Sequence, residues 1–323
     1  MQEEVQKSHS YPATMGKYEQ QKLVKERYRL YLKDSKTAPN SAFTYQYWDN
    51  GRTLPGRGEL TNWDCGDSLG YFQCPSCGTT DKWVKNCSKA SCPICFENWL
   101  ARRTEESGNR LEQASIMLGR SPKHVVLSPP PDANPTDTEI NRMWRLLGAK
   151  GGLWIPHPWR FGDQATGNQI SWKVTDINPK SKKKIPAFGY RSFHVHGLVF
   201  GFLMQSDRFY ELSGGWVYKN KGERRVNQGR RKRHEKFSSA KATLYYLLSH
   251  TSIDGRKQTV HWFGNCSNNR MKVDITEGYE ARQCPVCKID MLKFRVREGV
   301  TTEVDNLQKV RYKFYTFREV KKK

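Results

Sequence analysis

Two histidines separated by one residue lie in the segment 193–198, FHVHGL. Its β-branched and aromatic residues predict a strand, in which side chains at positions i and i+2 point to the same face. His194 and His196 would then be neighbours on an otherwise apolar strand, where imidazoles without partners are costly to bury. A shared divalent cation removes that cost, since neutral imidazole is a common metal ligand. The pair predicts a metal site, and Gly197 would leave room for another chain or a phosphate. The alternative is two structural histidines.

Two adjacent tyrosines, Tyr245 and Tyr246, lie in the segment 240–250, AKATLYYLLSH, whose leucines predict a helix. A phenol oxygen can attack a phosphate if its proton is removed or if a metal ion polarises the phosphate. Neighbouring helix residues point roughly 100° apart, so only one of the two can face a given metal ion. The alternative is that both tyrosines are packing residues of an amphipathic helix.

Nine cysteines, including three C-x-x-C pairs, form the third set of candidate ligands. An odd number with such pairs favours zinc over disulfides in a reducing compartment. Fourteen residues separate the pair Cys74/Cys77 from the pair Cys92/Cys95, a spacing typical of a four-thiolate zinc site. Cys87 is equally usable beside Cys92 and Cys95. The sequence therefore predicts one zinc ion bound by four of these five cysteines.

Cys284 and Cys287 form half of a further zinc site. Cys266 with His261 or His250 could complete it, because these are the nearest candidates in the sequence. Alternatively Cys65, or an amino-terminal cysteine left over from the first site, could complete it and join the two ends of the chain. Four protein ligands leave no open position on the ion, so we expect these zinc sites to be structural.

The chain is strongly basic, with 55 Lys and Arg against 32 Asp and Glu among 323 residues, a formal charge of +23. This charge favours polyanionic partners, and ten Trp suit stacking on unpaired bases. The most basic stretch, 219–236, lies between the histidine pair and the tyrosines. A solvated loop is the alternative to DNA contact there. The candidate DNA-binding residues are Lys219, Lys221, Arg224, Arg225, Arg230, Arg231, Lys232 and Arg233.

The amino-terminal residues contain no apolar stretch like that of a signal peptide. The longest apolar-leaning run, 193–204, contains two histidines and falls short of the ~18 residues that a membrane span needs. We therefore expect a soluble cytoplasmic protein without a membrane partner.

The elements that must position these residues predict an α+β fold with an antiparallel sheet, since strands and helices are interspersed without regular βαβ spacing. We expect strands at 124–128, 170–178, 191–202 and near 310–323, and helices at 17–33, after Thr136 or Asp137, and within 236–253. One or two helices should follow Cys95. The expected domains are a helix-and-loop extension (1–64), a cysteine-rich zinc module with helix (65–118), a catalytic domain (119–260), and a zinc half-site with basic tail (261–323).

Segment 193–201, FHVHGLVFG, resembles the HUH motif (His, hydrophobic, His) of rolling-circle replication initiators. HVVLSPPP (124–131) lies upstream, where those proteins have their first strand motif, and LYYLLSH (244–250) lies downstream, where they have the nucleophilic tyrosine. Segment 86–99, NCSKASCPICFENW, is similar to the cysteine segment that precedes the nuclease domain in Rep proteins of archaeal plasmids and pleomorphic viruses. The resemblance covers roughly residues 74–290.

The resemblance implies an HUH nuclease domain in which His194 and His196 bind Mg²⁺ or Mn²⁺. Tyr246, with Tyr245 as the alternative, would attack the scissile phosphate of single-stranded DNA or an origin hairpin. The product would be a 5′-phosphotyrosine and a 3′-hydroxyl that primes replication, with host replication proteins as further partners. One departure is Ser249, because many relatives have Lys three residues after the tyrosine. The third metal ligand stays open among His157, Glu211 and His250.

Two other functions fit the same sequence. A single-strand HUH transposase would use the same chemistry. A non-catalytic zinc-ribbon protein that binds nucleic acid would use His194 and His196 only as structural residues.

Overall fold

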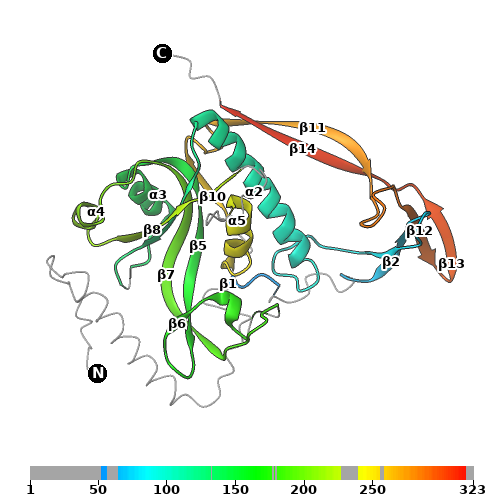
Figure 1. Ribbon diagram of the computed structural model, residues 1–323, viewed down its shortest axis with the longest axis horizontal. Coiled ribbons are helices and arrows are strands. Elements are labelled where there is room, and N and C mark those ends of the chain that lie inside the picture. Colours follow the sequence, from blue (N-terminus) through cyan, green and yellow to red (C-terminus); the bar gives the residue numbers. More distant parts are fainter. Residues whose placement is uncertain are drawn as a thin grey trace, which may run out of the picture.

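The computed structural model describes residues 52–56, 65–131, 133–176, 178, 180–226, 239–254 and 258–317. Over these residues the protein is an α+β structure with antiparallel sheets (Figure 1). The helix predicted at 17–33 lies outside them. The central sheet has the order β10-β5-β7-β4-β8, and β6 pairs with β5. Its strands are β4 (Lys123–Ser128), β5 (Ala149–Asp163), β6 (Gln169–Ile170), β7 (Ala187–Gly201), β8 (Val217–Glu223) and β10 (His261–Gly264).

Helices cover both faces of this sheet, because β7 alternates apolar side chains between them. Leu198 and Phe200 pack in one cluster with α2 (Phe96–Leu118) and α5 (Ala240–Leu248). Val195 and Val199 pack in the other with α3 (Asp137–Leu146) and α4 (Ser206–Ser213). Among the described helices, none combines the length and the apolar composition that a membrane crossing requires.

Local sequence signals account for the helix ends. Thr136 caps α3 in a capping box with Glu139, so the predicted helix start is confirmed. The residues after Cys95 form the single helix α2, which ends at Gly119 in the left-handed conformation. The predicted strand at 170–178 is wrong. β6 pairs with β5, a 3₁₀ turn at Trp172–Val174 follows, and Thr175 forms an isolated bridge with Ile185, while the Trp172 ring packs with Leu54 and Phe161.

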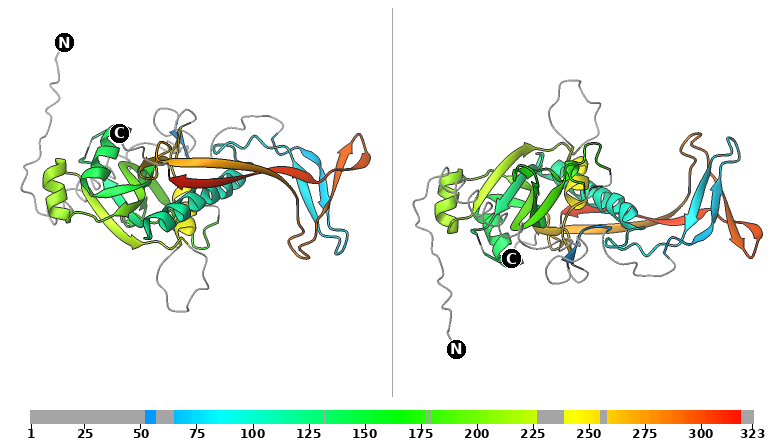
Figure 2. Two further views of the ribbon diagram at one scale, coloured as in Figure 1. Left: turned by 90° about the horizontal axis from the view of Figure 1, so that it is seen from above. Right: turned by 90° about the horizontal axis from the view of Figure 1, so that it is seen from below.

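An arm extends from this body (Figures 1 and 2). It consists of β11 (Met271–Ala281) and β14 (Leu307–Phe317), which pair antiparallel along their whole length. A four-stranded sheet of order β13-β12-β2-β3, here called the tip sheet, lies at its far end. Its strands are β2 (Ser68–Gln73), β3 (Thr80–Val84), β12 (Leu292–Arg297) and β13 (Val300–Val304). Strands from the predicted segments 65–118 and 261–323 thus share one sheet.

The remaining strands are short. β1 (Arg52–Thr53) pairs with β9 (Ile253–Asp254), just after α5. Arg110 joins the arm to the body. Its guanidinium donates to the Cys266 carbonyl (2.6 Å) and to Asn268 Oδ1 (2.7 Å), and it lies over the rings of Trp262 and Tyr315. Through these contacts α2 holds both the turn before β11 and the strand β14.

Candidate metal centres and the neighbouring tyrosine

Three histidines of the central sheet form a group that could hold a metal ion. His194 and His196 lie on the same face of β7, and His157 of β5 pairs with His194 across the strands. The candidate ligand atoms of the three all lie within 4.8 Å of one another. β5 was not predicted, because two prolines and a Gly-Gly pair obscure its alternation. Of the candidates for a third ligand, the structure brings His157 into the group.

The triad offers a cation neutral nitrogen donors, and the charged side chain that acts on His194 and His196 is the guanidinium of Arg160. Burial holds the pKa of each histidine well below its ordinary value, so each imidazole is neutral and keeps one unprotonated nitrogen. His194 Nδ1 donates to the Ser192 carbonyl (2.8 Å), which leaves its Nε2 for a ligand. His157 Nε2 is buried and has no hydrogen-bond partner among the described residues. A buried nitrogen without a partner is what a bound metal ion would satisfy.

Behind the triad lies a fourth histidine that the sequence analysis missed. His124 of β4 shares a 2.9 Å hydrogen bond with His196 Nδ1, and Arg224 donates to His124 Nδ1 (3.1 Å). Burial, and then the charge of Arg224, lower the pKa of His124 to about 3. His124 therefore positions the His196 ring from the side away from the triad. The signal was available in the sequence, since alternation along 124–128 places His124 on one face with Val126.

The structure also places the predicted DNA-binding residues. Arg224 donates to the carbonyls of Lys221, Gly222 and Glu223 as well as to His124, so its guanidinium is engaged inside the protein. Lys219 and Lys221 are exposed on β8, and the register places Lys219 in line with Val126 and His196, on the triad's face. Arg225 is half-buried. Arg230, Arg231, Lys232 and Arg233 lie outside the described residues.

The Tyr246 ring of α5 is connected to the triad by the ring of His250, which contacts both. Its ring centroid lies 4.5 Å from that of His250, which lies 4.5 Å from that of His157. The Tyr246 hydroxyl shares a hydrogen bond with Ser171 Oγ (3.2 Å), and Lys173 Nζ lies 4.9 Å from the centre of its ring. Burial raises the pKa of Tyr246 above its ordinary value and outweighs the bond with Ser171, which lowers it.

Tyr245 points elsewhere, as the angle between adjacent helix residues requires. Its hydroxyl donates to Glu97 Oε2 (3.2 Å), and Glu97 forms an ion pair with Lys180 (2.7 Å). Tyr245 therefore faces the start of α2, away from the histidines. Glu211 belongs to α4, on the opposite face of the sheet. Gly197 gives no approach to a ligand, because the Trp144 ring fills the space that a Cβ would need.

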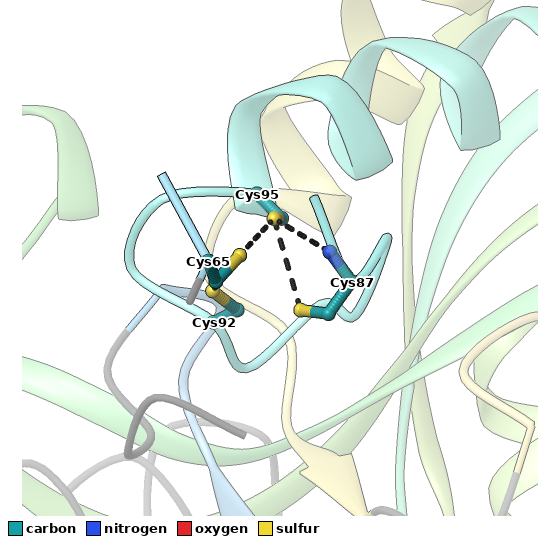
Figure 3. A group of neighbouring side chains, drawn as sticks. All are labelled: Cys65, Cys87, Cys92 and Cys95. Carbon is teal, nitrogen blue, oxygen red and sulfur yellow. Dashed lines mark hydrogen bonds between the residues drawn. The ribbon is translucent and has the colours of Figure 1, made fainter. Parts of the chain in front are cut away.

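Four cysteines beside the start of α2 form a second group that could hold a metal ion, Cys65, Cys87, Cys92 and Cys95 (Figure 3). The Sγ atom of Cys95 lies 3.0 Å from that of Cys65 and 3.7 Å from that of Cys87. Thiolates around a tetrahedral zinc ion lie about 3.8 Å apart, so a small adjustment would accommodate one. The hydrogen bond with Cys95, and burial, raise the pKa of Cys65 to about 12, so a cation is needed for this thiol to ionise at neutral pH.

The remaining group, Cys74, Cys77, Cys284 and Cys287, lies in the tip sheet. The turn between β2 and β3 carries the first pair, the turn before β12 carries the second, and Cys77 Sγ lies 3.6 Å from Cys284 Sγ. Hydrogen bonds from Thr79 lower the pKa of Cys77 to about 6, which favours the thiolate that a metal ion binds.

The prediction that four of the five cysteines between 74 and 95 bind one ion is therefore wrong. Pairing of β2 with β12 takes Cys74 and Cys77 to the tip, and Cys65 completes the group near α2. Of the alternatives for the Cys284 half-site, Cys65 does not join it, whereas the amino-terminal pair Cys74 and Cys77 lies beside it. Cys266 is instead buried in the core beneath α2, and His261 stacks on Trp154 at 3.8 Å.

Comparison with protein-family models, with curated proteins and with solved structures finds no match to this chain. Over the residues that the structure describes, the protein has an α+β fold with antiparallel sheets and three groups of side chains that could each hold a metal ion. Its function must be argued from the chemistry of these groups.

Proposed function

We propose that this protein is a metal-dependent nuclease of the HUH type, which nicks single-stranded DNA with Tyr246 and initiates rolling-circle replication. One observation carries the proposal: three histidines on one sheet face lie beneath the helix that carries Tyr246, and the ring of His250 contacts both Tyr246 and His157. The order of these elements along the chain is the one that the resemblance to rolling-circle initiators implies. The same chemistry also serves single-strand transposition.

The donor atoms indicate which cation the triad would hold. Mg²⁺ prefers oxygen ligands and keeps several waters, whereas imidazole suits softer divalent ions. Three histidines therefore favour Mn²⁺ over Mg²⁺ among the two ions that the resemblance implies. When bound there, the ion would polarise the scissile phosphate. We propose that the two cysteine groups hold zinc with four thiolates each, which stabilises the fold and leaves no open position.

The proposed step forms a bond between Tyr246 Oη and phosphorus and breaks the bond from phosphorus to the 3′ oxygen. The 3′ oxygen takes a proton from solvent and leaves as a hydroxyl. The phenol proton of Tyr246 is released to solvent, and the hydrogen bond with Ser171 orients the Tyr246 hydroxyl. Lys173 supplies positive charge beside the ring, and this stabilises the phenolate. Lys173 would thus serve in place of the lysine that the sequence lacks at Ser249.

Burial of the triad favours a second candidate function. His157 is 2% exposed and His194 is 5% exposed. A catalytic ion needs an open position for the phosphate, whereas a structural ion does not. A nucleic-acid-binding protein with a third structural metal site is therefore the alternative. The half-buried His196 marks the side from which a phosphate would have to enter.

A covalent adduct assay tests the proposal. The purified protein is incubated with Mn²⁺ and a random-sequence pool of labelled single-stranded DNA, and adducts that survive denaturation are counted and sequenced. We expect an adduct that Tyr246→Phe and His157→Gln abolish and that Tyr245→Phe, the matched control, retains. Lys173→Met should slow adduct formation about 10-fold or more, as the loss of one stabilising charge does. Binding of the pool without any adduct would favour the second candidate function.

A further inference from the structure

One face of the tip sheet concentrates positive charge. Lys293, Arg295 and Arg297 alternate along β12, so all three project from the same side. The register places Arg295 in line with Gly70 and Trp83. We call this side, made by Trp83, Lys293, Arg295 and Arg297, the basic face.

Two cations of the basic face, those of Lys293 and Arg295, lie over one aromatic ring, that of Trp83. Lys293 Nζ lies 4.1 Å and Arg295 Cζ 5.4 Å from the centre of the Trp83 ring. Asp81 lies on the same face, and Arg282 forms an ion pair with it. Among the described residues of the four strands, the register places no second carboxylate on this side. The face therefore keeps an excess of positive charge in a fixed arrangement.

The opposite side of the tip sheet has different chemistry. Tyr71 and Phe294 stack there with ring centroids 5.1 Å apart, and the register sets Lys82 beside Tyr71 and Glu303 beside Phe294. Beside the Tyr71–Phe294 pair the charges of Lys82 and Glu303 therefore balance. Because the two sides differ in charge, a polyanion has one side of the sheet to bind.

We propose that the basic face binds the sugar-phosphate backbone of duplex DNA. Lys293 lies over the Trp83 ring, so this ring does not offer a free surface on which an unpaired base could stack. The face instead offers ammonium and guanidinium groups, which bind phosphates without regard to sequence. The alternative interpretation is that these side chains only cover the small apolar core of the tip sheet with their methylene groups.

The length of the arm determines how far from the body the basic face could contact DNA. Eleven paired residues of β11 and β14, at about 3.4 Å each, span about 37 Å, the length of about 11 base pairs of B-form DNA. A duplex is stiff enough to keep that spacing, whereas a single strand is not. The arm could therefore carry the tip up to about one helical turn of duplex beyond the body that holds the histidine triad. The position of this contact relative to a cut site depends on the proposed function, whereas the phosphate contact itself does not.

Two variants with the same charge change test the phosphate contact. Lys293→Met removes the charge and keeps an apolar chain over Trp83, and Lys82→Met does the same on the opposite side. Binding of a 30-base-pair DNA duplex is measured by fluorescence anisotropy, without divalent ions, over a range of salt. We expect Lys293→Met to weaken binding about eightfold at 0.1 M salt and to reduce the salt slope by about 0.9, the effect of one phosphate contact. Lys82→Met should bind like the wild type.

Equal losses in both variants, or none in Lys293→Met, would overturn the proposal, as would tighter binding of an RNA duplex of the same length. Thermal unfolding of each variant shows whether the tip sheet is still folded. Hydroxyl-radical footprinting then tests the placement: a protected stretch of duplex separate from the cut should disappear in Lys293→Met. Adduct formation on a short single strand should be unchanged in this variant. If the wild type forms no adduct, the proposed nuclease fails while the duplex-binding result still decides the role of the basic face.

Discussion

Paired cysteine substitutions test how the eight clustered cysteines are divided. Cys74 and Cys284 belong to one group in the structure, whereas Cys74 and Cys92 belong to two. Replacing Cys74 and Cys284 together with serine should therefore remove one zinc ion per chain. Replacing Cys74 and Cys92 together should remove two, because each substitution takes one thiolate from a different four-cysteine group.

The magnitude follows from the geometry. Four sulfurs about 3.8 Å apart surround one ion, and a thiolate lost from such a set leaves three ligands that hold zinc much less tightly. Zinc per chain is counted by native mass spectrometry and by release to a chromophoric chelator. The difference between the variants is the decisive number, since the histidine triad could contribute a further ion to every one of them.

Cys266→Ala is the matched control, because Cys266 is buried in the core and outside both groups. It should lose no zinc. The reasoning is refuted if the Cys74 and Cys92 variant keeps one cysteine-bound ion, as a single site made from residues 74 to 95 would require. Loss of two ions from the Cys74 and Cys284 variant would refute it equally.

Three further predictions concern stability. Arg110→Met should lower the free energy of unfolding in urea by about 2–4 kcal/mol, since the Cys266 carbonyl would lose its buried charged partner; an unchanged urea midpoint would contradict this. Gly197→Ala should cost about 1–3 kcal/mol, because the new Cβ would lie 2.7 Å from the Trp144 ring, and a thermal melt identical to the wild type would show that the ring moves freely. Burial lowers the pKa of His124 and of His250 to about 3, so the unfolded chain binds protons below its own pKa near 6.5 while the native chain does not. The free energy of unfolding should therefore fall by about 1.4 kcal/mol per pH unit for each of these histidines below pH 6.5, and His124→Gln should reduce the slope measured in urea titrations between pH 7 and 5.

Local patterns predicted much of the central body. The alternation of 191–202 identified the strand with His194 and His196, and the capping residues identified α3, because both signals depend on neighbours in the sequence. The leucines around Tyr245 and Tyr246 identified α5. The α+β class with an antiparallel sheet followed from the order of these elements and is confirmed.

The parts that the sequence did not predict depend on residues far apart in the chain. Cys77 and Cys284 are 207 residues apart, and no spacing rule relates them. His157 could not be chosen over His250 or Glu211, because its place in the triad depends on the register of β5 with β7. Trp172 belonged to a segment with strand-like composition, but a separate cluster with Leu54 determines its conformation.

The two cysteine pairs of the tip sheet, Cys74/Cys77 and Cys284/Cys287, are far apart in the sequence, so the ribosome synthesises them at different times. The group near α2 is complete once the ribosome has synthesised Cys95, whereas the tip must wait for Cys287. Until then, β2 has no β12 beside it and is an unpaired edge strand on that side. The thiols of Cys74 and Cys77 also lack their partners. A nascent chain of this protein would therefore carry the thiols of Cys74 and Cys77 without their partner cysteines for most of its synthesis.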